Sequence, residues 1–530
     1  MATREDNRHL SRSSFLKVTS GAVGAASLVG APALLGGTTA LAETSPAPKR
    51  GGRLTASVNE EIKILDAYTS EINLWRTIRE NVFDTLIYDD LEHLPLSLKP
   101  RLATAWGYKD PTTFELTLRT GVKFHDGSSF DAEDVKFSLD RLLTLNSFIG
   151  VSLGPVSKVI VVDPTHVQIK MQRPFAGLPA GLAHVCIYSK NATQLTFTQQ
   201  PIGTGPFRFA EFRPAAYTKL TRFEGYWEPG VPYLDEIMLP VIIEDASRLA
   251  ALQSGQTDML LGLSQADAPM LMKDPRIAVL RGLVRSATDV FYLNLFQKPL
   301  DNPLARQALS HMIDRKTYYK VILNGFGAAG CSPFIPQNWA YDPKEGDVSR
   351  WPYDLSRAKD LLSKAGYPNG KGFHLVFALV VGFPELLEGA QMLQAAVAQV
   401  GGSMDILTQE VPVWIDTIEK NFNYNLSSDT SSRAEADPAA TLSDQFMFGP
   451  NSIIGRWRNP TVSKILAEGA SKFTIAERRP YYYQYQTIWN QNLYGMILGQ
   501  RDLLSASTRR VHGFVENCEN YRNFRYTSLA

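Results

Sequence analysis

Two hydrophobic periodicities occur along this chain, and together they predict a fold that mixes strands with helices. Apolar and polar residues alternate over residues 114–118 and again over 167–171, which is typical of half-buried strands. Elsewhere apolar residues recur at helical spacing directly after Asp131, Asn302 and Asp354, and each of these side chains can cap the first turn of a helix. The chain is therefore predicted to be an α/β protein with several lobes.

The length and the charge of the chain narrow the class further. Its 530 residues suggest three or four domains, at roughly 100–200 residues each. Its 54 basic and 53 acidic residues leave a net charge of +1, whereas proteins that act on nucleic acid usually carry a basic excess. With 44% hydrophobic residues, the composition is that of a folded chain and not of a disordered one. We therefore expect a folded protein without a nucleic-acid partner.

The first 42 residues are typical of an export signal. Basic residues precede a weakly apolar run over 18–41, and the run ends in Ala40-Leu41-Ala42, which is typical of a cleavage site. A membrane anchor is the alternative, but its Gly, Ser and Thr residues and Pro32 make this run a poor spanning helix. We expect cleavage near Ala42 and a periplasmic mature protein. Residues 1–42 hold four basic and two acidic residues, so cleavage changes the net charge from +1 to −1.

The sequence leaves the export route open. Residues 11–17, Ser-Arg-Ser-Ser-Phe-Leu-Lys, resemble the twin-arginine export motif, but Ser13 stands where that motif has its second arginine. The general secretory route is the alternative. No later segment supplies 18 consecutive apolar residues, so the sequence predicts a mature chain without a membrane-spanning helix.

The three cysteines, Cys186, Cys331 and Cys518, are too few for a disulfide scaffold. Because an odd number cannot all pair, at most one disulfide could form in an oxidising compartment. We expect most of the three to be small buried thiols.

No motif in the sequence indicates a reaction centre, a metal or a cofactor. The chain has no H-E-x-x-H and no C-x-x-C, and no two of its eight histidines lie at i, i+4. Residues 203–208 lack the third glycine of a dinucleotide loop, and 369–372 lack the Ser or Thr of a phosphate loop. His125-Asp126 could be an acid–base pair, but Gly127 follows it and the sequence is typical of a turn. We expect neither catalysis nor a cofactor.

An ordered series of motifs runs along the chain, and the resemblance that the series carries spans about residue 50 to the C-terminus. It begins with Pro100-Arg101-Leu102-Ala103-Thr104-Ala105-Trp106, which resembles the pattern P-x-L-A-x-x-W. Matching segments follow at 114–119, 121–127 and 131–138, and later ones extend to Asp437-Pro438. In this order the motifs resemble bacterial solute-binding protein family 5, the substrate-binding proteins of peptide-, nickel- and opine-type ABC transporters.

The resemblance implies a periplasmic-binding-protein-like fold of class II. Two α/β lobes would enclose a ligand cleft and close over the ligand, and an additional α/β domain would be attached to the first lobe. The implied bounds are 43–90 with 201–285 and 500–530 for the first lobe, 91–200 for the additional domain, and 286–499 for the second lobe.

The resemblance also implies which residues line the cleft. A loop after Leu65-Asp66 would form a first-lobe wall, and the strand before Phe291 would bring polar residues to the crossing between lobes. A second-lobe tryptophan would supply the aromatic contact of peptide binders, and a loop before Asp437-Pro438 would face the ligand directly. The implied ligand-binding residues are Tyr68, Glu71, Asn73, Arg285, Thr288, Trp414, Ser432, Arg433 and Glu435.

The loop before Asp437-Pro438 departs from the pattern of peptide binders. These place an aspartate, which holds the α-amino group of the peptide, where this chain has Ala434. The neighbouring Arg433 instead indicates a carboxylate or phosphate on the ligand, since a guanidinium can bind either group bidentately. A surface ion pair between Arg433 and Glu435 is the alternative. Oligopeptides, modified peptides, opines, sugar conjugates and metal chelates all stay open as ligands.

By this resemblance the protein captures a small solute by lobe closure and delivers it to an ABC permease and ATPase complex at the membrane. We expect a monomer without a bound cofactor or metal. Two other hypotheses stay open at this point. One is an exported sensor or chaperone with the same ligand-binding scaffold, and the other is an exported hydrolase on that scaffold.

Overall fold

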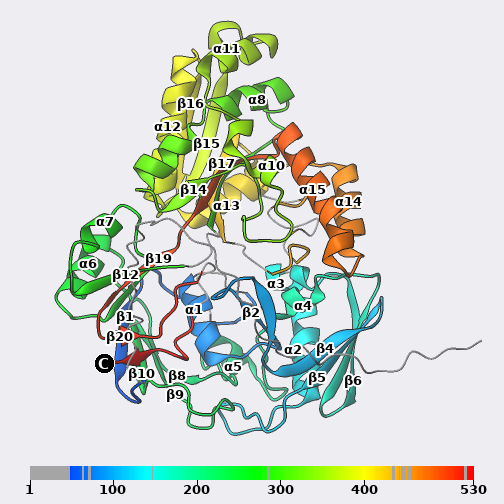
Figure 1. Ribbon diagram of the computed structural model, residues 1–530, viewed down its shortest axis with the longest axis vertical. Coiled ribbons are helices and arrows are strands. Elements are labelled where there is room, and N and C mark those ends of the chain that lie inside the picture. The colour runs from blue at the N-terminus through cyan, green and yellow to red at the C-terminus, as the bar shows by residue number, and fades with distance from the viewer. Residues whose placement is uncertain are drawn as a thin grey trace, which may run out of the picture. The chain divides into compact units, whose positions relative to one another are not determined.

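A computed structural model provides the fold of the chain (Figure 1). The residues that it describes all lie within the unit Pro48–Ala530. They are residues 48–62, 65–69, 73–145, 147–282, 287–432, 436–440, 442, 448–451, 455–517 and 522–530.

A seven-stranded sheet combines segments from both ends of the described chain, in the order β12-β19-β11-β1-β10-β9-β8. Near its middle, β1 runs parallel to β10 and β11, while β19 runs antiparallel to β11 and β12. Helices α1, α6 and α7 contact β8, β11 and β12, respectively. The strand bounds are β1 (Arg53–Ser57), β8 (Phe207–Arg213), β9 (Tyr217–Arg222), β10 (Glu236–Pro240), β11 (Met259–Leu261), β12 (Ile277–Arg281) and β19 (Leu504–Thr508). The helices are α1 (Asn73–Val82), α6 (Asp245–Gln253) and α7 (Ala268–Leu271).

A six-stranded sheet has the order β14-β18-β13-β17-β15-β16. Its strand β13 is buried along its whole length and runs antiparallel to both β18 and β17, whereas β15 runs parallel to β16 and β17. Helix α12 lies along β15 and β16 (Figure 1). The strand bounds are β13 (Ala287–Leu293), β14 (Gly327–Ala329), β15 (His374–Val380), β16 (Ser403–Gln409), β17 (Leu426–Ser432) and β18 (Gly495–Arg501). The helices after β13 are α8 (Pro303–His311), α9 (Arg315–Thr317), α10 (Pro343–Gly346), α11 (Leu355–Lys364), α12 (Pro384–Gln399), α13 (Val411–Asp416), α14 (Pro460–Ala470) and α15 (Ile475–Asn492).

A four-stranded antiparallel sheet has the order β4-β5-β7-β6. Its residues lie in the chain between β1 and β8, two strands of the seven-stranded sheet. Helix α2 contacts β6 and β7. The bounds are β4 (Ala103–Asp110), β5 (Thr113–Leu118), β6 (Val156–Asp163), β7 (His166–Met171), α2 (Ala132–Thr144), α3 (Phe148–Ser152), α4 (Leu178–Leu182) and α5 (Gln194–Thr198). Two short pairs complete the fold: β2 (Ile87–Asp90) with β3 (Ser97–Pro100), and β20 (Val511–His512) with β21 (Ser528–Leu529).

The elements predicted from local sequence patterns are confirmed. The alternating segments 114–118 and 167–171 form strands β5 and β7. The Asp131 carboxylate accepts from the backbone N of Glu133, and Asp134 reaches back to the backbone N of Asp131, so α2 begins with a capping box. As expected, helices α8 and α11 are capped by the side chains of Asn302 and Asp354, which accept from the backbone N of Leu304 and Arg357.

The cysteine prediction is confirmed for the residues that the structure describes. Cys186 and Cys331 are buried free thiols, and burial raises the pKa of Cys186 to about 12. Cys518 lies outside the described residues.

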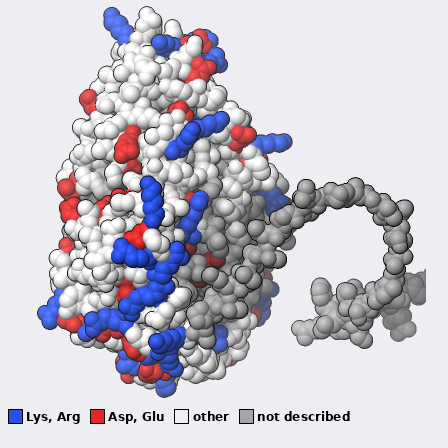
Figure 2. Space-filling model, turned by 60° about the vertical axis from the view of Figure 1, so that its left-hand side comes forward, with Lys and Arg blue, Asp and Glu red and all other residues white. Residues whose placement is uncertain are grey.

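Two further observations concern membrane-spanning helices and surface charge. Within the described residues, no helix is both long and apolar enough to cross a bilayer. Figure 2 shows Lys and Arg side chains interspersed with Asp and Glu on the face that it draws, which fits the near-zero net charge. The domain boundaries proposed from the sequence stay a prediction.

Candidate functional site

The chain crosses between the seven-stranded and the six-stranded sheet at two places. One crossing leads from β12 to β13, and residues 283–286 within it are outside the described part; the other leads from β18 to β19. Since β13 and β18 pair antiparallel, Ala287 stands opposite Arg501 and Thr288 opposite Gln500. Both crossings therefore meet the six-stranded sheet at the same end, where β13 begins and β18 ends. This end of the sheet, together with the two crossings, forms the junction between the two sheets, and Thr288 lies in it.

A buried cluster of charges fixes the first residues of this junction. The Arg501 guanidinium pairs with Glu385, and its Nε lies 3.2 Å from Oδ1 of Asp289. The Tyr319 hydroxyl donates to Oδ2 of Asp289 at 3.0 Å. Burial raises the pKa of Asp289 to about 6, although the Arg501 charge opposes that shift. The pKa of Arg501 is raised because Glu385 and Asp289 outweigh the opposite effect of its burial.

The second crossing is held from several sides at Asp502. Its buried carboxylate Oδ2 lies 2.5 Å from Nη2 of Arg281, which ends β12. Its carbonyl accepts from Nε2 of Gln265 at 2.8 Å, and the Gln265 carbonyl in turn accepts from Nδ2 of Asn324 at 3.2 Å. The backbone N of Asp502 donates to the carbonyl of Phe326 at 3.3 Å. These bonds connect both sheets through one residue.

The segment after β17, predicted to face the ligand, is anchored just beyond residues 433–435. Arg478 Nη1 and Nη2 lie 2.5 and 2.6 Å from the two carboxylate oxygens of Asp437. The Trp339 indole donates to the carbonyl of Ala436 at 3.0 Å. On its other side, the backbone N of Ala436 donates to Oδ2 of Asp89 in β2 at 3.3 Å. Three residues distant in sequence, Arg478, Trp339 and Asp89, therefore fix the position at which this segment ends.

The loop after Leu65 is also fixed, by one bond within the loop and by bonds to Arg141 and Cys186. The Asp66 carboxylate accepts from Arg141 and from the backbone N of Tyr68, the latter at 3.1 Å. The Tyr68 ring is 1% exposed and packs edge-on against Tyr188, and its hydroxyl donates to the Cys186 carbonyl at 2.6 Å. Burial raises the pKa of Tyr68 well above its usual value. In this structure Tyr68 is thus a core residue that holds the loop through its contacts with Tyr188 and Cys186.

The structure brings some of the predicted ligand-binding residues together. Thr288 in β13 pairs with Ser431 in β17, and its neighbour Ala287 pairs with Ser432. Trp414 lies in α13 and is half-buried, and its indole donates to Oγ of Ser427 in β17 at 3.1 Å. Of the remaining predicted residues, Glu71, Arg285, Arg433 and Glu435 lie outside the described residues, as do the side chains of Asn73 and Ser432.

Several residues of this junction were not predicted from the sequence. Asp89, Trp339 and Arg478 anchor the segment at 436–437, and Asp289 with Arg501 forms the buried cluster. The sequence signal that was available, Asp437-Pro438, marks one partner only, because the other partners come from elements far away along the chain.

The histidine that could have been a catalytic base has a structural role. His125 Nε2 lies 2.9 Å from the Gly205 carbonyl, and the backbone N of Gly203 donates to its Nδ1 at 3.3 Å. Burial lowers the pKa of His125 to about 4, so the ring is neutral at pH 7. It joins the 121–127 turn to the 203–205 segment. The described part of the chain contains no group of three or more His, Cys, Asp or Glu side chains able to hold a metal.

Comparison with known proteins gives matches over most of the chain. A sequence model described as bacterial extracellular solute-binding proteins, family 5 Middle, matches residues 97–450. The glutathione-binding protein GsiB of Pectobacterium atrosepticum is 29% identical over 483 residues, which cover 86% of this chain and 90% of that protein.

Two solved structures show the same fold. The periplasmic binding protein DppA of Helicobacter pylori, in complex with the peptide STSA, has a TM-score of 0.79 and 24% identity, with 91% of this chain and 98% of that chain covered. A dipeptide-binding protein of Pseudoalteromonas sp. SM9913, in complex with Met-Leu, has a TM-score of 0.81 and 22% identity, with 90% and 100% covered. The predicted two-lobe, class II fold is thereby confirmed.

Proposed function

This chain belongs to the bacterial extracellular solute-binding proteins of family 5, and on that premise we propose that its solute is a small peptide-like anion of the glutathione class. Members of this family bind peptides or other small solutes and deliver them to the permease and ATPase of an ABC importer. The proposal concerns which solute this chain carries, how it is held and how the chain reaches its compartment.

The observation that carries the proposal is the breadth of the match to glutathione-binding relatives. The alignment covers 86% of this chain and 90% of the Pectobacterium protein, so it extends over most of both chains. Glutathione is a γ-linked tripeptide with more carboxylate than ammonium groups. That charge fits a chain that has Ala434 where peptide binders have an aspartate for the α-amino group, and Arg433 next to it.

Capture would follow from closure of the two lobes over the solute. The two chain crossings are the elements about which the lobes would move, and the bonds of Asp502 and of the Asp289–Arg501–Glu385 cluster define their ends. The Asp437–Arg478 pair would hold the end of the ligand-facing loop in place, so that little conformational entropy is lost when the solute binds.

We further propose that the protein is a binding component without catalytic activity, exported by a signal that is cleaved near Ala42. The relatives are binding proteins, and His125, which could have formed an acid–base pair with Asp126, is buried and bonded to backbone. The twin-arginine and the general secretory routes both stay compatible with Ser13.

Thermal unfolding and calorimetric titration with reduced glutathione test the proposed solute class. A solute present at 100 times its Kd should stabilise the protein by about 2.7 kcal/mol, because it binds only the folded state. The matched comparisons are glutathione ethyl ester, which lacks one carboxylate, and tri-alanine, an ordinary tripeptide. Glutathione should bind at least tenfold more tightly than either. Equal binding of tri-alanine, or no binding of glutathione, would contradict the proposal.

Arg433→Ala gives a residue-level test. Truncation of one partner of a desolvated charge pair should weaken glutathione binding by about 2–5 kcal/mol. The exposed Arg357, which pairs with Asp360 on the surface of α11, provides the matched control, and Arg357→Ala should leave the Kd unchanged. An unchanged Kd in Arg433→Ala would remove Arg433 from the proposed site.

A further inference from the structure

Residues 287–501, which supply the six-stranded sheet, are joined to the rest of the chain by the two crossings, one before β13 and one after β18. Other contacts between this stretch and the residues before β13 are non-covalent, so a rotation of the lobes about the crossings can break them. A group of such contacts involves the β2–β3 hairpin, strand β4 and the segment 175–177.

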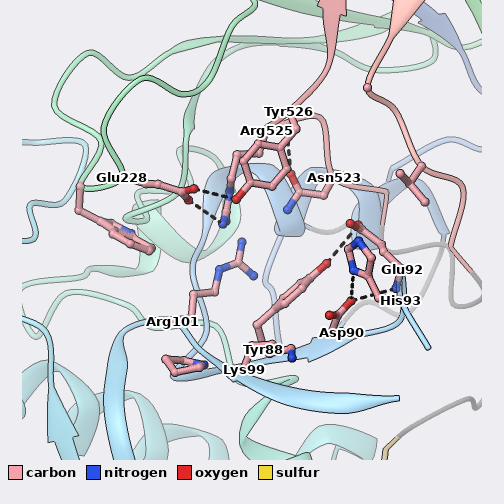
Figure 3. Close-up of a pocket in the computed structure, with 14 residues that line it drawn as sticks. Tyr88, Asp90, Glu92, His93, Lys99, Arg101, Glu228, Asn523, Arg525 and Tyr526 are labelled. Atoms are coloured by element: carbon pink, nitrogen blue, oxygen red, sulfur yellow. Dashed lines mark hydrogen bonds and ion pairs between the residues drawn. The ribbon is translucent and has the colours of Figure 1, made fainter. Parts of the chain in front are cut away.

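The hairpin contributes one face of β2. Tyr88 and Asp90 line a cavity of about 400 Å³ together with Arg525 from the C-terminal stretch (Figure 3). Successive residues of a strand point to opposite faces, so Asp89 points away from this cavity, and its Oδ2 accepts from the backbone N of Ala436 at 3.3 Å. The hairpin therefore meets the stretch 287–501 with the face that is turned away from the cavity.

An apolar contact follows directly after β2. Leu91 and Ile335 are both buried and form one hydrophobic cluster, against which Leu96 of the hairpin packs. Because Ile335 belongs to the stretch 287–501, this cluster also spans the two sides.

The segment 175–177 makes the second part of the contact. The backbone N of Ala176 donates to the carbonyl of Ala470, the last residue of α14, at 2.7 Å. Tyr108 in β4 packs against Phe473, with ring centroids 4.5 Å apart, and its hydroxyl donates to the Phe175 carbonyl. A backbone hydrogen bond and a ring contact thus join the four-stranded sheet to the end of α14 and the residues after it.

Gly177 lets the two sides approach closely. A Cβ at this position would lie 2.8 Å from Cβ of Ala439 and 3.0 Å from the backbone N of Ala440, so a larger residue would displace residues 439–440. The φ of Gly177 is −78°, which any residue can adopt, so the glycine is required by space and not by backbone conformation. Ala439 and Ala470 are buried in a hydrophobic cluster whose other members all lie outside 287–501.

We propose that these contacts form a latch that holds the two lobes closed and has to open before a solute enters or leaves. One side of the latch consists of Asp89, Leu91, Tyr108 and residues 175–177, and the other side of Ile335, residues 436–440 and residues 470–473. All of these contacts join protein atoms, so the inference does not depend on which solute the protein carries. Because Ala436 directly follows residues 433–435, a solute held by that loop would reinforce the latch.

Hydrogen exchange of the Ala176 amide measures the latch directly, because the acceptor of this N–H, the Ala470 carbonyl, belongs to the other lobe. The Gln172 amide is the internal reference, since it donates to the Pro155 carbonyl on its own side at 2.8 Å. The experiment uses the purified protein without added solute, so its failure would leave the proposed solute class untouched. In the wild type, the Ala176 amide should exchange at least tenfold more slowly than an unprotected amide.

Gly177→Ala should speed the exchange of the Ala176 amide at least tenfold and leave the Gln172 amide unchanged. Gly107→Ala in β4 is the matched control, because a Cβ at Gly107 meets nothing within 4 Å. It should leave both amides as they are in the wild type.

Phe473→Ala weakens the latch from the other side and leaves the segment 175–177 itself unaltered. It should speed the exchange of the Ala176 and Ala436 amides by similar factors of at least ten, because one opening of the lobes exposes both. Phe296→Ala removes another exposed ring of the same stretch and should change neither rate.

The assignment is overturned if the wild-type Ala176 amide exchanges like an unprotected amide, or if either latch variant behaves like its control. Equal acceleration of the Gln172 amide would also overturn it, because the four-stranded sheet would then be unfolding. Acceleration of Ala176 without Ala436 in Phe473→Ala would do the same, because the segment 175–177 would then be detaching alone.

Discussion

Replacement of Arg478 by methionine is expected to destabilise the protein strongly. In the folded state its two terminal nitrogens lie 2.5 and 2.6 Å from Asp437, and the two side chains are 4% and 15% exposed. Arg478→Met leaves the Asp437 carboxylate buried without its cation. Loss of one partner of a buried pair typically destabilises by about 3–5 kcal/mol. Solute binding should weaken as well, because the segment at 436–437 loses one of its anchors.

A double variant distinguishes the loss of the pair from the loss of packing. In Asp437→Asn with Arg478→Met no unpaired charge remains, so at least half of the stability lost in the single variant should be regained. Arg357→Met breaks the half-exposed pair with Asp360 at 3.2 Å and should lower stability by no more than about 1 kcal/mol.

The assay is urea unfolding followed by tryptophan fluorescence, together with calorimetric titration of the solute. Trp339 is a suitable reporter, since its ring centroid lies 4.9 Å from Cζ of Arg478 and its indole is bonded to Ala436. The reasoning would be refuted if Arg478→Met lost no more stability than Arg357→Met, or if the double variant were less stable than Arg478→Met alone.

Three further predictions concern residues outside this pair. His125 has a pKa of about 4 in the folded protein, below that of a histidine in the unfolded chain, so its ring is neutral at pH 7. The free energy of unfolding should therefore fall as the pH drops from about 6.5 to 4. Urea unfolding should show a weaker pH dependence in His125→Gln. Asp131→Ala should lower the free energy of unfolding by about 1 kcal/mol, because α2 loses its N-terminal cap. Asp140→Ala on the same helix should change it by about 0.5 kcal/mol or less. Equal losses in the two variants would contradict the capping role. Tyr68→Phe should lower the free energy of unfolding by about 1 kcal/mol and leave the Kd for the solute unchanged, because the Tyr68 hydroxyl is bonded to the Cys186 carbonyl. Weaker solute binding at unchanged stability would instead place Tyr68 in the binding site.

Interactions between residues close in sequence were predictable. Asp131 and Asp134 are three residues apart, and their capping box requires only that the chain turn into a helix there. The same holds for the caps of α8 and α11 and for the alternation of β5 and β7. In each case the partners are brought together by local backbone geometry, which the sequence specifies directly.

Interactions between distant residues were not predictable in this way. The backbone N of Ala436 bonds to Asp89, which is 347 positions earlier in the chain, and Arg478 is 41 positions from Asp437. Neither pairing has a local signal, since an Asp or an Arg alone does not specify its partner. The family resemblance predicts that the segment before Asp437-Pro438 faces the ligand, but among the residues that anchor this segment it marks only Asp437.

The hairpin β2–β3 shows where the two kinds of information meet. The sequence by itself determines that Tyr88 and Asp90 alternate with Asp89, because a strand has a period of two residues. Only the tertiary structure decides that one face meets Ala436 while the other meets Arg525 from the C-terminal stretch. The physical reason is that local backbone geometry sets which side chains share a face, whereas sheet register and chain crossings set what that face meets.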